Sequence, residues 1–221
     1  MPRLAVIIPV LSDSDALGRL LADITPDPSV ELVVVDGGHD PTLAPLLAGR
    51  SDTQLVRAGA GRGAQMNAGA AAATAPLLLF LHADSRLPEG WRAALFDLPL
   101  HVAGGWFRFA LDESAWQARV LESLVAWRVR LFSLPYGDQG LFVRRDTFDR
   151  LGGFQQWPLM EDVDFVRRLT AAEATAEIPL ALRTSARRWR HDGWCRRSLR
   201  NLALVTLYFA GVPPAQLHRW Y

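Results

Sequence analysis

The chain has 221 residues, half of them hydrophobic and 21% charged, a composition typical of one globular domain with a sizeable core. A formal net charge of +1 gives no reason to expect a nucleic acid as partner. All 24 basic residues are arginine, which excludes the lysine of a P-loop and a Schiff-base lysine. The single cysteine, Cys195, excludes an internal disulfide and a cysteine-rich zinc site and favours a cytoplasmic location.

The first part of the chain alternates between strand and helix patterns. Strands are predicted at residues 4–11, 31–36, 54–57 and from residue 77 onward, and helices at residues 16–24, 43–48 and after the glycine-rich loop that begins at Ala58. This β-α-β-α-β-α-β order predicts a parallel, doubly wound sheet with right-handed crossovers.

The second part contains more helix. Helices are predicted at residues 91–96, 114–132, 144–151, 161–172 and 198–210, and strands at residues 104–110, 140–143 and 180–184. The helix at 114–132 and the segment 202–212 each have one apolar side, the former through Trp116, Val120, Leu124 and Trp127. We expect these sides to pack in the core or in a homodimer, with a membrane surface as the alternative. No apolar run reaches the roughly 20 residues that cross a bilayer.

His82 and Asp84 follow the apolar run that starts at Leu77. Because side chains alternate along a strand, both are predicted to point the same way at its carboxyl end, where open α/β sheets bind ligands. An imidazole and a carboxylate there are suited to a divalent cation. The alternative is that Asp84 caps a turn and His82 belongs to the core. Asp36 also ends a predicted strand.

The glycine-rich loop allows another interpretation. Gly59, Gly61 and Ala64 match the pattern G-x-G-x-x-A of dinucleotide-binding proteins, and Asp84 follows at a suitable distance for a ribose contact. An NAD-type oxidoreductase is therefore one alternative. Against it, the pattern normally occupies the first β-α turn, whereas two β-α units precede it here.

Three later clusters carry polar groups. Glu161 and Asp162 begin a predicted helix. One interpretation is that these acidic residues complement the helix dipole, and the other is that Asp162 acts as a general base. Residues 136–140 form a polar turn before a strand. Residues 185–200 hold six arginines, two tryptophans and His191, a pattern that fits a solvated basic face or a diphosphate site.

Taken together, the ordered segments resemble family 2 glycosyltransferases of the GT-A fold, most of all a small bacterial subgroup associated with radical-SAM/selenodomain proteins. The matching segments cover nearly the whole chain: AVIIPVL, ELVVVDGG, AGAGRGAQMNAG, LLFLHADS, YGDQGLFVRR, GGF, PLMEDVDF and SARRWRHDGW. The resemblance implies one Rossmann-like α/β domain, residues 1–221, with a mostly parallel central sheet flanked by helices. Residues 1–86 would form the nucleotide-binding half and residues 87–221 the acceptor and catalytic half.

The resemblance also implies a metal-dependent, inverting transfer of a sugar from a nucleoside-diphosphate sugar to a hydroxyl acceptor. Asp162 would be the base, and Asp84 would hold Mn²⁺ or Mg²⁺. His82 stands where the family's D-x-D motif usually has its first aspartate, and a nitrogen ligand favours manganese. The other residues implied are Asp36, Arg62 and Asn67 at the nucleoside, Arg187 and Arg188 at the diphosphate, His191 at the diphosphate or metal, and Asp138, Gln139, Glu161 and Trp189 at the acceptor or donor sugar.

Three points stay open at this level. The donor base, the sugar and the acceptor are not specified, and a lipid-linked acceptor is one alternative. A nucleotide-sugar-binding protein without turnover is an alternative function, which the presence of both Asp84 and Asp162 argues against. The expected location is the cytoplasm, with contact at the inner face of the membrane as an alternative.

Overall fold

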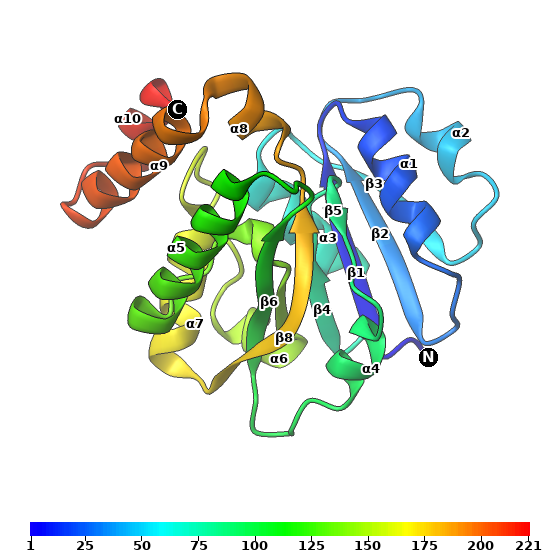
Figure 1. Cartoon of the computed structure of the whole chain (residues 1–221). Coiled ribbons are helices and arrows are strands. Elements are labelled where there is room, and N and C mark those ends of the chain that lie inside the picture. The colour runs from blue at the N-terminus through cyan, green and yellow to red at the C-terminus, as the bar shows by residue number, and fades with distance from the viewer.

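The computed structural model describes residues 1–221 as one eight-stranded sheet with helices on both faces (Figure 1). Its strands are β1 Leu4–Val10, β2 Val30–Asp36, β3 Thr53–Arg57, β4 Leu77–Phe80, β5 Ser85–Arg86, β6 Gly104–Leu111, β7 Leu141–Arg144 and β8 Thr175–Thr184. They are ordered β3-β2-β1-β4-β7-β6-β8-β5 across the sheet.

The first four strands in this order are parallel, as predicted. The rest of the sheet is mixed: β7 runs antiparallel to β4 and β6, β6 and β8 are parallel, and β5 is antiparallel to β8. The parallel arrangement predicted from the first four strands is therefore confirmed for residues 4–80, and the antiparallel pairs occur in the second part of the sheet. The chain after β6 returns through a helix and a loop to the same end of the sheet, so the next strand must run in the opposite direction.

The helices are α1 Ser14–Asp23, α2 Leu43–Leu47, α3 Arg62–Ala72, α4 Trp91–Phe96, α5 Trp116–Phe132, α6 Arg145–Arg150, α7 Glu161–Ala172, α8 Arg187–Asp192, α9 Trp194–Phe209 and α10 Pro214–Leu217, with short 3₁₀ turns η1 Gly137–Gln139 and η2 His218–Trp220. Every predicted helix is present. The elements without a prediction, β5, α8, α10 and both 3₁₀ turns, are too short to show a periodic pattern.

Strand β8 begins five residues earlier than predicted, at Thr175 rather than residue 180. Pro179 explains the difference. The register with β6 shifts between Phe107 and Arg108, which pair with Ile178 and Ala181, so Pro179 lies in a bulge outside the regular ladder. A proline inside an apolar run weakens the sequence signal for a strand, and a bulge is one of the few places in a sheet that accommodates it.

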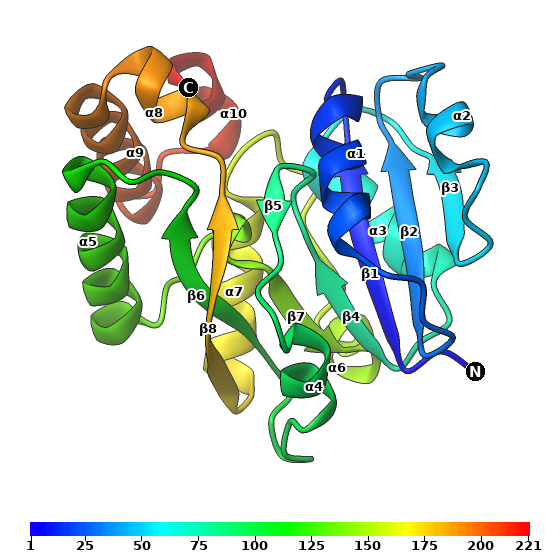
Figure 2. The same cartoon turned by 45° about the vertical axis from the view of Figure 1, so that its right-hand side comes forward.

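The sheet has an apolar core on each face, and successive residues of β1 serve opposite cores. Leu4 and Val6 pack with apolar residues of α1, α2 and α4. Ala5 and Ile7 pack on the other face with α3, α6 and α7. The result is three layers, helix on sheet on helix (Figure 2). The C-terminal helices α8 to α10 lie beyond the carboxyl ends of β6 and β8.

The apolar side predicted for α5 does not pack in the core, which was one of its predicted environments. Trp116, Val120, Leu124 and Trp127 are all exposed. The helix packs on the core through smaller residues on its opposite side, Ala118, Val125 and Val129. Thus α5 is apolar on two sides, and the pattern alone could not show which side faces the sheet. No helix has the length and apolar character needed to cross a membrane.

Candidate active site

One cavity lies between the sheet and the helices α8 and α9, and it collects most of the residues singled out in the sequence. The predicted residues in its lining are Arg62, His82, Asp84, Asp138, Asp162, Arg188 and Trp189. They come from five separate parts of the chain, the start of α3, the loop after β4, η1, the start of α7, and α8. Carboxylates, an imidazole and guanidinium groups therefore converge on one space.

His82 and Asp84 lie in a loop rather than on the strand, because β4 ends at Phe80. The prediction that strand alternation aligns their side chains was therefore wrong, although both side chains do line the cavity. The loop is held by two backbone hydrogen bonds, from the Leu81 amide to the Ile7 carbonyl and from the Ser85 amide to the His82 carbonyl. These bonds turn the chain over the end of the sheet and keep both side chains facing the same space.

Burial, together with the positive charge of Arg62, lowers the pKa of His82 to about 4. The imidazole is therefore neutral near pH 7, and a neutral imidazole nitrogen is the form that binds a metal ion. His82 is not a satisfied core histidine, because it faces the cavity and no hydrogen bond involves its ring.

Gly137 brings Asp162 and His82 close together. A Cβ added at Gly137 would lie 3.1 Å from Asp162 Oδ2 and 3.3 Å from His82 Nε2. The Gly137 amide donates a hydrogen bond of 2.7 Å to Asp162 Oδ2, and the Val163 amide donates one of 2.8 Å to Oδ1. The carboxylate of Asp162 is thus held at a fixed orientation in the same pocket as His82 and Asp84.

Asp138 is a second carboxylate in this part of the cavity. Burial raises its pKa to about 6, against the opposing effect of Arg128. Arg128 itself is fixed by a hydrogen bond to the Leu134 carbonyl and by stacking over Tyr136, 3.4 Å from the ring centroid. Asp138 therefore changes its protonation close to neutral pH, whereas an exposed aspartate would be fully ionised there.

Glu161 lies behind the cavity and supports Arg62. Its carboxylate is only 1% exposed, and its Oε1 lies 2.7 Å from Arg62 Nε. Burial raises the pKa of Glu161, while the positive charge of Arg62 opposes that effect. The adjacent Gly63 has no room for a side chain, since a Cβ there would lie 2.3 Å from the Gln155 carbonyl oxygen. Close packing of the first turn of α3 against Gln155 keeps the Arg62 side chain at the cavity.

The helices α8 and α9 form a wall of a different character. Arg188 and Arg197 donate hydrogen bonds of 3.4 and 3.1 Å to the Tyr221 hydroxyl. Trp189 Nε1 and Asn201 Oδ1 are buried without a hydrogen-bond partner. Arg197, Asn201 and Tyr221 were not singled out in the sequence. Arg197 belongs to the arginine-rich run, but nothing in that run indicated which arginines face inward.

Besides Glu161, five residues predicted for the site lie outside the cavity lining: Asp36, Asn67, Gln139, Arg187 and His191. The side-chain amide of Asn67 makes two hydrogen bonds to the backbone of Phe154. It donates one of 2.8 Å to the Phe154 carbonyl and accepts one of 2.9 Å from the Phe154 N–H. The Gln139 side chain is buried and donates to the Phe107 carbonyl. Both amides therefore fix loops, and neither lines the cavity. Their motifs pointed to the right part of the fold and not to the side chains that face the space.

Asp36 and His191 also lie outside the cavity lining. Asp36 is buried at the end of β2, where its Oδ1 accepts hydrogen bonds from the Gly38 and Asp40 amides. The His191 ring is 88% exposed and lies 2.8 Å from Asp192. The prediction that His191 binds the metal or the diphosphate finds no support, because α8 turns this side chain toward solvent. Arg187 pairs with Asp13 and lies 3.9 Å from Asp84.

No three His, Cys, Asp or Glu side chains cluster closely enough to hold a metal ion by themselves. The side chains of His82 and Asp84, which both line the cavity, offer a metal ion two ligands. A divalent ion prefers more ligands than two, and the remainder would have to be substrate or water oxygens. This set of groups fits an ion whose remaining ligands are oxygens of a bound substrate or of water.

Residues 5–142 match the family model for glycosyl transferase family 2, which is more than half of the chain. The chain belongs to glycosyltransferase family 2. The match includes His82, Asp84 and Asp138 and ends before Asp162 and the helices α8 and α9. The glycine pattern at Gly59 follows β3, an edge strand of the sheet, which is not the position of a dinucleotide fingerprint. No curated protein shows significant similarity in sequence.

Solved structures with the same fold support the GT-A assignment. The mannosyltransferase PcManGT from Pyrobaculum calidifontis, solved with GDP-Man and Mn²⁺, is 20% identical, with a TM-score of 0.62 over 82% of this chain and 56% of its own. S. aureus TarS with UDP-GlcNAc is 15% identical, with a TM-score of 0.60 over 84% and 58%. Glucosyl-3-phosphoglycerate synthase from Mycobacterium tuberculosis, with Mn²⁺, UDP and phosphoglyceric acid, is 19% identical, with a TM-score of 0.59 over 81% and 69%. The chain thus spans little more than half the length of the first two.

Proposed function

We propose that this chain transfers a sugar from a nucleoside-diphosphate sugar to a hydroxyl group of an acceptor, with inversion at the anomeric carbon. The observation that carries the proposal is the convergence of Asp84, Asp162 and Arg188 in one cavity of a family 2 chain. Structures of the same fold contain donors of this class, GDP-Man in PcManGT and UDP-GlcNAc in TarS.

The leaving group of this reaction is a nucleoside diphosphate, and its negative charge grows as the sugar departs. Asp84 and His82 would hold a divalent metal, which when bound supplies positive charge beside the diphosphate. Arg188 presents a planar guanidinium to the same space and suits the oxygens of a phosphate. Arg187 lies close to Asp84 and is placed to support the same group. Together these groups stabilise the charge that develops in the transition state.

Asp162 is the general base in this proposal. A sugar or alcohol hydroxyl is a poor nucleophile near pH 7, and a positioned base contributes roughly 10²–10⁴-fold to the rate. The amides of Gly137 and Val163 hold the carboxylate in one orientation beside His82. Inversion needs a single displacement, so no covalent nucleophile is required. Asp138 then serves the acceptor or the donor sugar and not the proton transfer.

The nucleoside would lie toward Asp36 and Arg62, at the carboxyl ends of the parallel strands. The acceptor would enter along the wall formed by α8 and α9, where Trp189 and Asn201 have unpaired polar atoms and Leu204 and Val205 add apolar side chains. A wall with both kinds of group suits an acceptor that has an apolar portion, such as a lipid-linked alcohol.

Thermal unfolding with UDP, GDP, CDP, dTDP and NAD, each with and without Mn²⁺, tests the donor half of the proposal. A ligand at about 100 times its dissociation constant adds about 2.7 kcal/mol to the free energy of unfolding. At roughly 2–4 °C per kcal/mol, this raises Tm by several degrees. We expect a manganese-dependent rise with one nucleoside diphosphate. A rise with NAD alone, or with none of the five, contradicts the proposal.

A further inference from the structure

The outer side of α5 is apolar along its whole length. Residues spaced by three and four lie on one side of a helix, and five exposed apolar residues follow this spacing: Trp116, Val120, Leu124, Trp127 and Leu131. The two tryptophans are 71% and 65% exposed. Because α5 already packs on the core through its other side, this exposed side has no partner within the chain.

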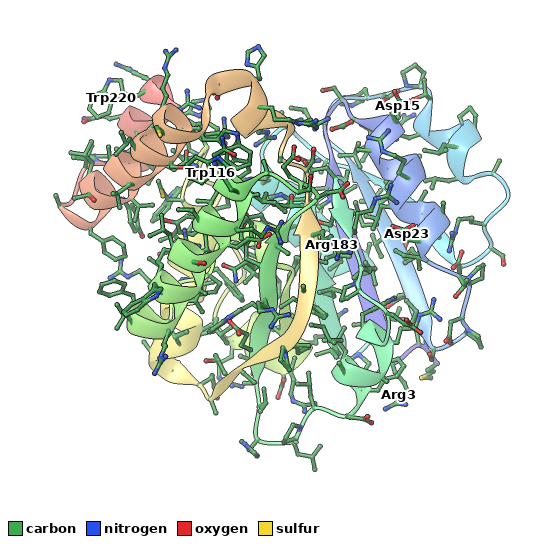
Figure 3. The ribbon with its side chains drawn as sticks, in the orientation of Figure 1. Arg3, Asp15, Asp23, Trp116, Arg183 and Trp220 are labelled. Carbon is green, nitrogen blue, oxygen red and sulfur yellow. The ribbon has the colours of Figure 1, made fainter.

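Helix α9 repeats the arrangement. Its inner side contributes Arg197, Leu204 and Val205 to the cavity and the small C-terminal core. Its outer side exposes Leu199, Leu202 and Phe209, the first two by more than 60%. The helices α5 and α9 lie side by side at one edge of the molecule in both views (Figures 1 and 2). Figure 3 shows Trp116 at the start of α5 and Trp220 at the outer limit of this edge.

The charges at this edge are almost all positive. Arg119 and Arg130 are exposed on α5, as is Arg196 on α9. Of the seven arginines in residues 187–221, Arg188 and Arg197 line the cavity, while Arg190, Arg196 and Arg219 are exposed. The one acidic residue in this range, Asp192, is already bonded to Arg197 and Arg200. The single acidic residue of α5, Glu122, forms a salt bridge with Arg119 and also accepts a hydrogen bond from the Leu111 amide. The net charge of +1 for the whole chain conceals this local excess.

We propose that the outer sides of α5 and α9 form a docking surface for an anionic lipid bilayer. Exposed leucine and phenylalanine side chains insert into the boundary between headgroups and acyl chains, and tryptophan favours that boundary. Arginine side chains next to them reach the anionic headgroups. A second copy of the chain fits this surface less well, because a two-fold contact would bring the same arginines against each other. The proposal does not depend on the glycosyltransferase activity.

Flotation with vesicles of phosphatidylcholine, with and without phosphatidylglycerol, tests the proposal. We expect the chain to float with the anionic vesicles, less so at high salt, and to sediment with the neutral ones. The double variant Leu124→Asp/Trp127→Asp should weaken binding at least about tenfold, since charged groups replace the inserted side chains. Leu100→Asp is the matched control, because Leu100 is exposed in the turn before β6, away from α5 and α9.

A second variant separates the two contributions. Arg119→Glu/Arg130→Glu should remove the preference for anionic vesicles while the apolar residues stay in place. Failure of the wild-type chain to float, or equal flotation of the Leu124→Asp/Trp127→Asp variant, overturns the proposal. Sedimentation velocity then tests the alternative occupant. If the wild-type chain does not float but forms a dimer that the Leu124→Asp/Trp127→Asp variant dissociates, the surface binds a second copy of the chain and the proposal is overturned. Thermal shifts with nucleoside diphosphates are measured without vesicles, so failure of the docking surface leaves the proposed activity standing.

Discussion

The two walls of the cavity are built from different parts of the chain and carry different chemistry. The wall at the strand ends holds His82, Asp84, Asp138 and Asp162, and it is largely acidic. The wall from α8 and α9 holds Arg188, Trp189 and Arg197, and it is cationic and aromatic. Three of the four residues in the first wall lie within the family match, and none of the second does. The proposed metal ligands His82 and Asp84 therefore lie within the family match, whereas Arg188, proposed for the diphosphate, lies beyond it.

The largest expected effect is on the acidic wall. Asp84→Asn removes the charged ligand, so the manganese-dependent rise in Tm with the nucleoside diphosphate should vanish, and transfer should fall by more than about 100-fold. Isothermal titration with Mn²⁺ and the diphosphate measures the binding directly. Asp149→Asn, an exposed aspartate on α6, is the control and should change neither quantity. Equal manganese dependence in the variant and the wild-type chain would remove Asp84 from the metal site.

Asp162→Asn separates chemistry from binding. The amide is close to isosteric but cannot accept the proton of the acceptor hydroxyl, so we expect transfer to fall roughly 10²–10⁴-fold. Donor affinity should stay within about threefold, because the proposed base does not hold the diphosphate. The comparison needs a donor-binding titration beside the rate. Loss of donor binding in parallel with the rate would mean that Asp162 binds the donor and is not the base.

A variant in the helix wall should have a smaller effect. Arg197 is buried and donates to Asp192 and to the Tyr221 hydroxyl. Lysine keeps the charge but cannot make both contacts in one plane, so Arg197→Lys should lower the free energy of unfolding by about 1.5–3 kcal/mol. Thermal unfolding measures the change, and Arg196→Lys, at the exposed neighbouring position, is the control. Equal Tm values for the two variants would show that the inner wall is not held by Arg197.

The smallest expected effect is a change in the pH dependence of stability. Burial raises the pKa of Asp138 to about 6 from an ordinary value of 3.8. Between about pH 4 and pH 6 the native chain keeps a proton that the unfolded chain has released, so this group lowers the free energy of unfolding as the pH rises. Asparagine cannot ionise. Asp138→Asn should therefore gain stability relative to the wild-type chain across this window and keep a constant advantage above it.

Tm values of both proteins at several pH values check this prediction. His82, whose pKa is lowered to about 4, acts in the opposite direction. It is present in both proteins, so the difference between their Tm values reports Asp138. Parallel profiles between pH 4 and pH 8 would show that the carboxyl of Asp138 titrates normally.

Short patterns in the amino-acid sequence predicted most of the strands and helices, the family resemblance and the position of polar residues after apolar strands. Each of these depends on short patterns, such as the unbroken run at Leu77 or the spacing within residues 161–172. The residues of the acidic wall were identified in this way. Even there, Asn67 and Gln139 show that a motif can locate a segment without showing which side chain faces the ligand.

Which of these residues come together depends on how the distant segments of the chain pack. Asp162 and His82 lie 80 positions apart, and they come together because both pack around Gly137. Local spacing carries no information about a contact of that kind. The same limit applies to α5, which carries apolar residues on two sides, because only packing on the sheet determines that Val125 is buried and Trp127 is exposed.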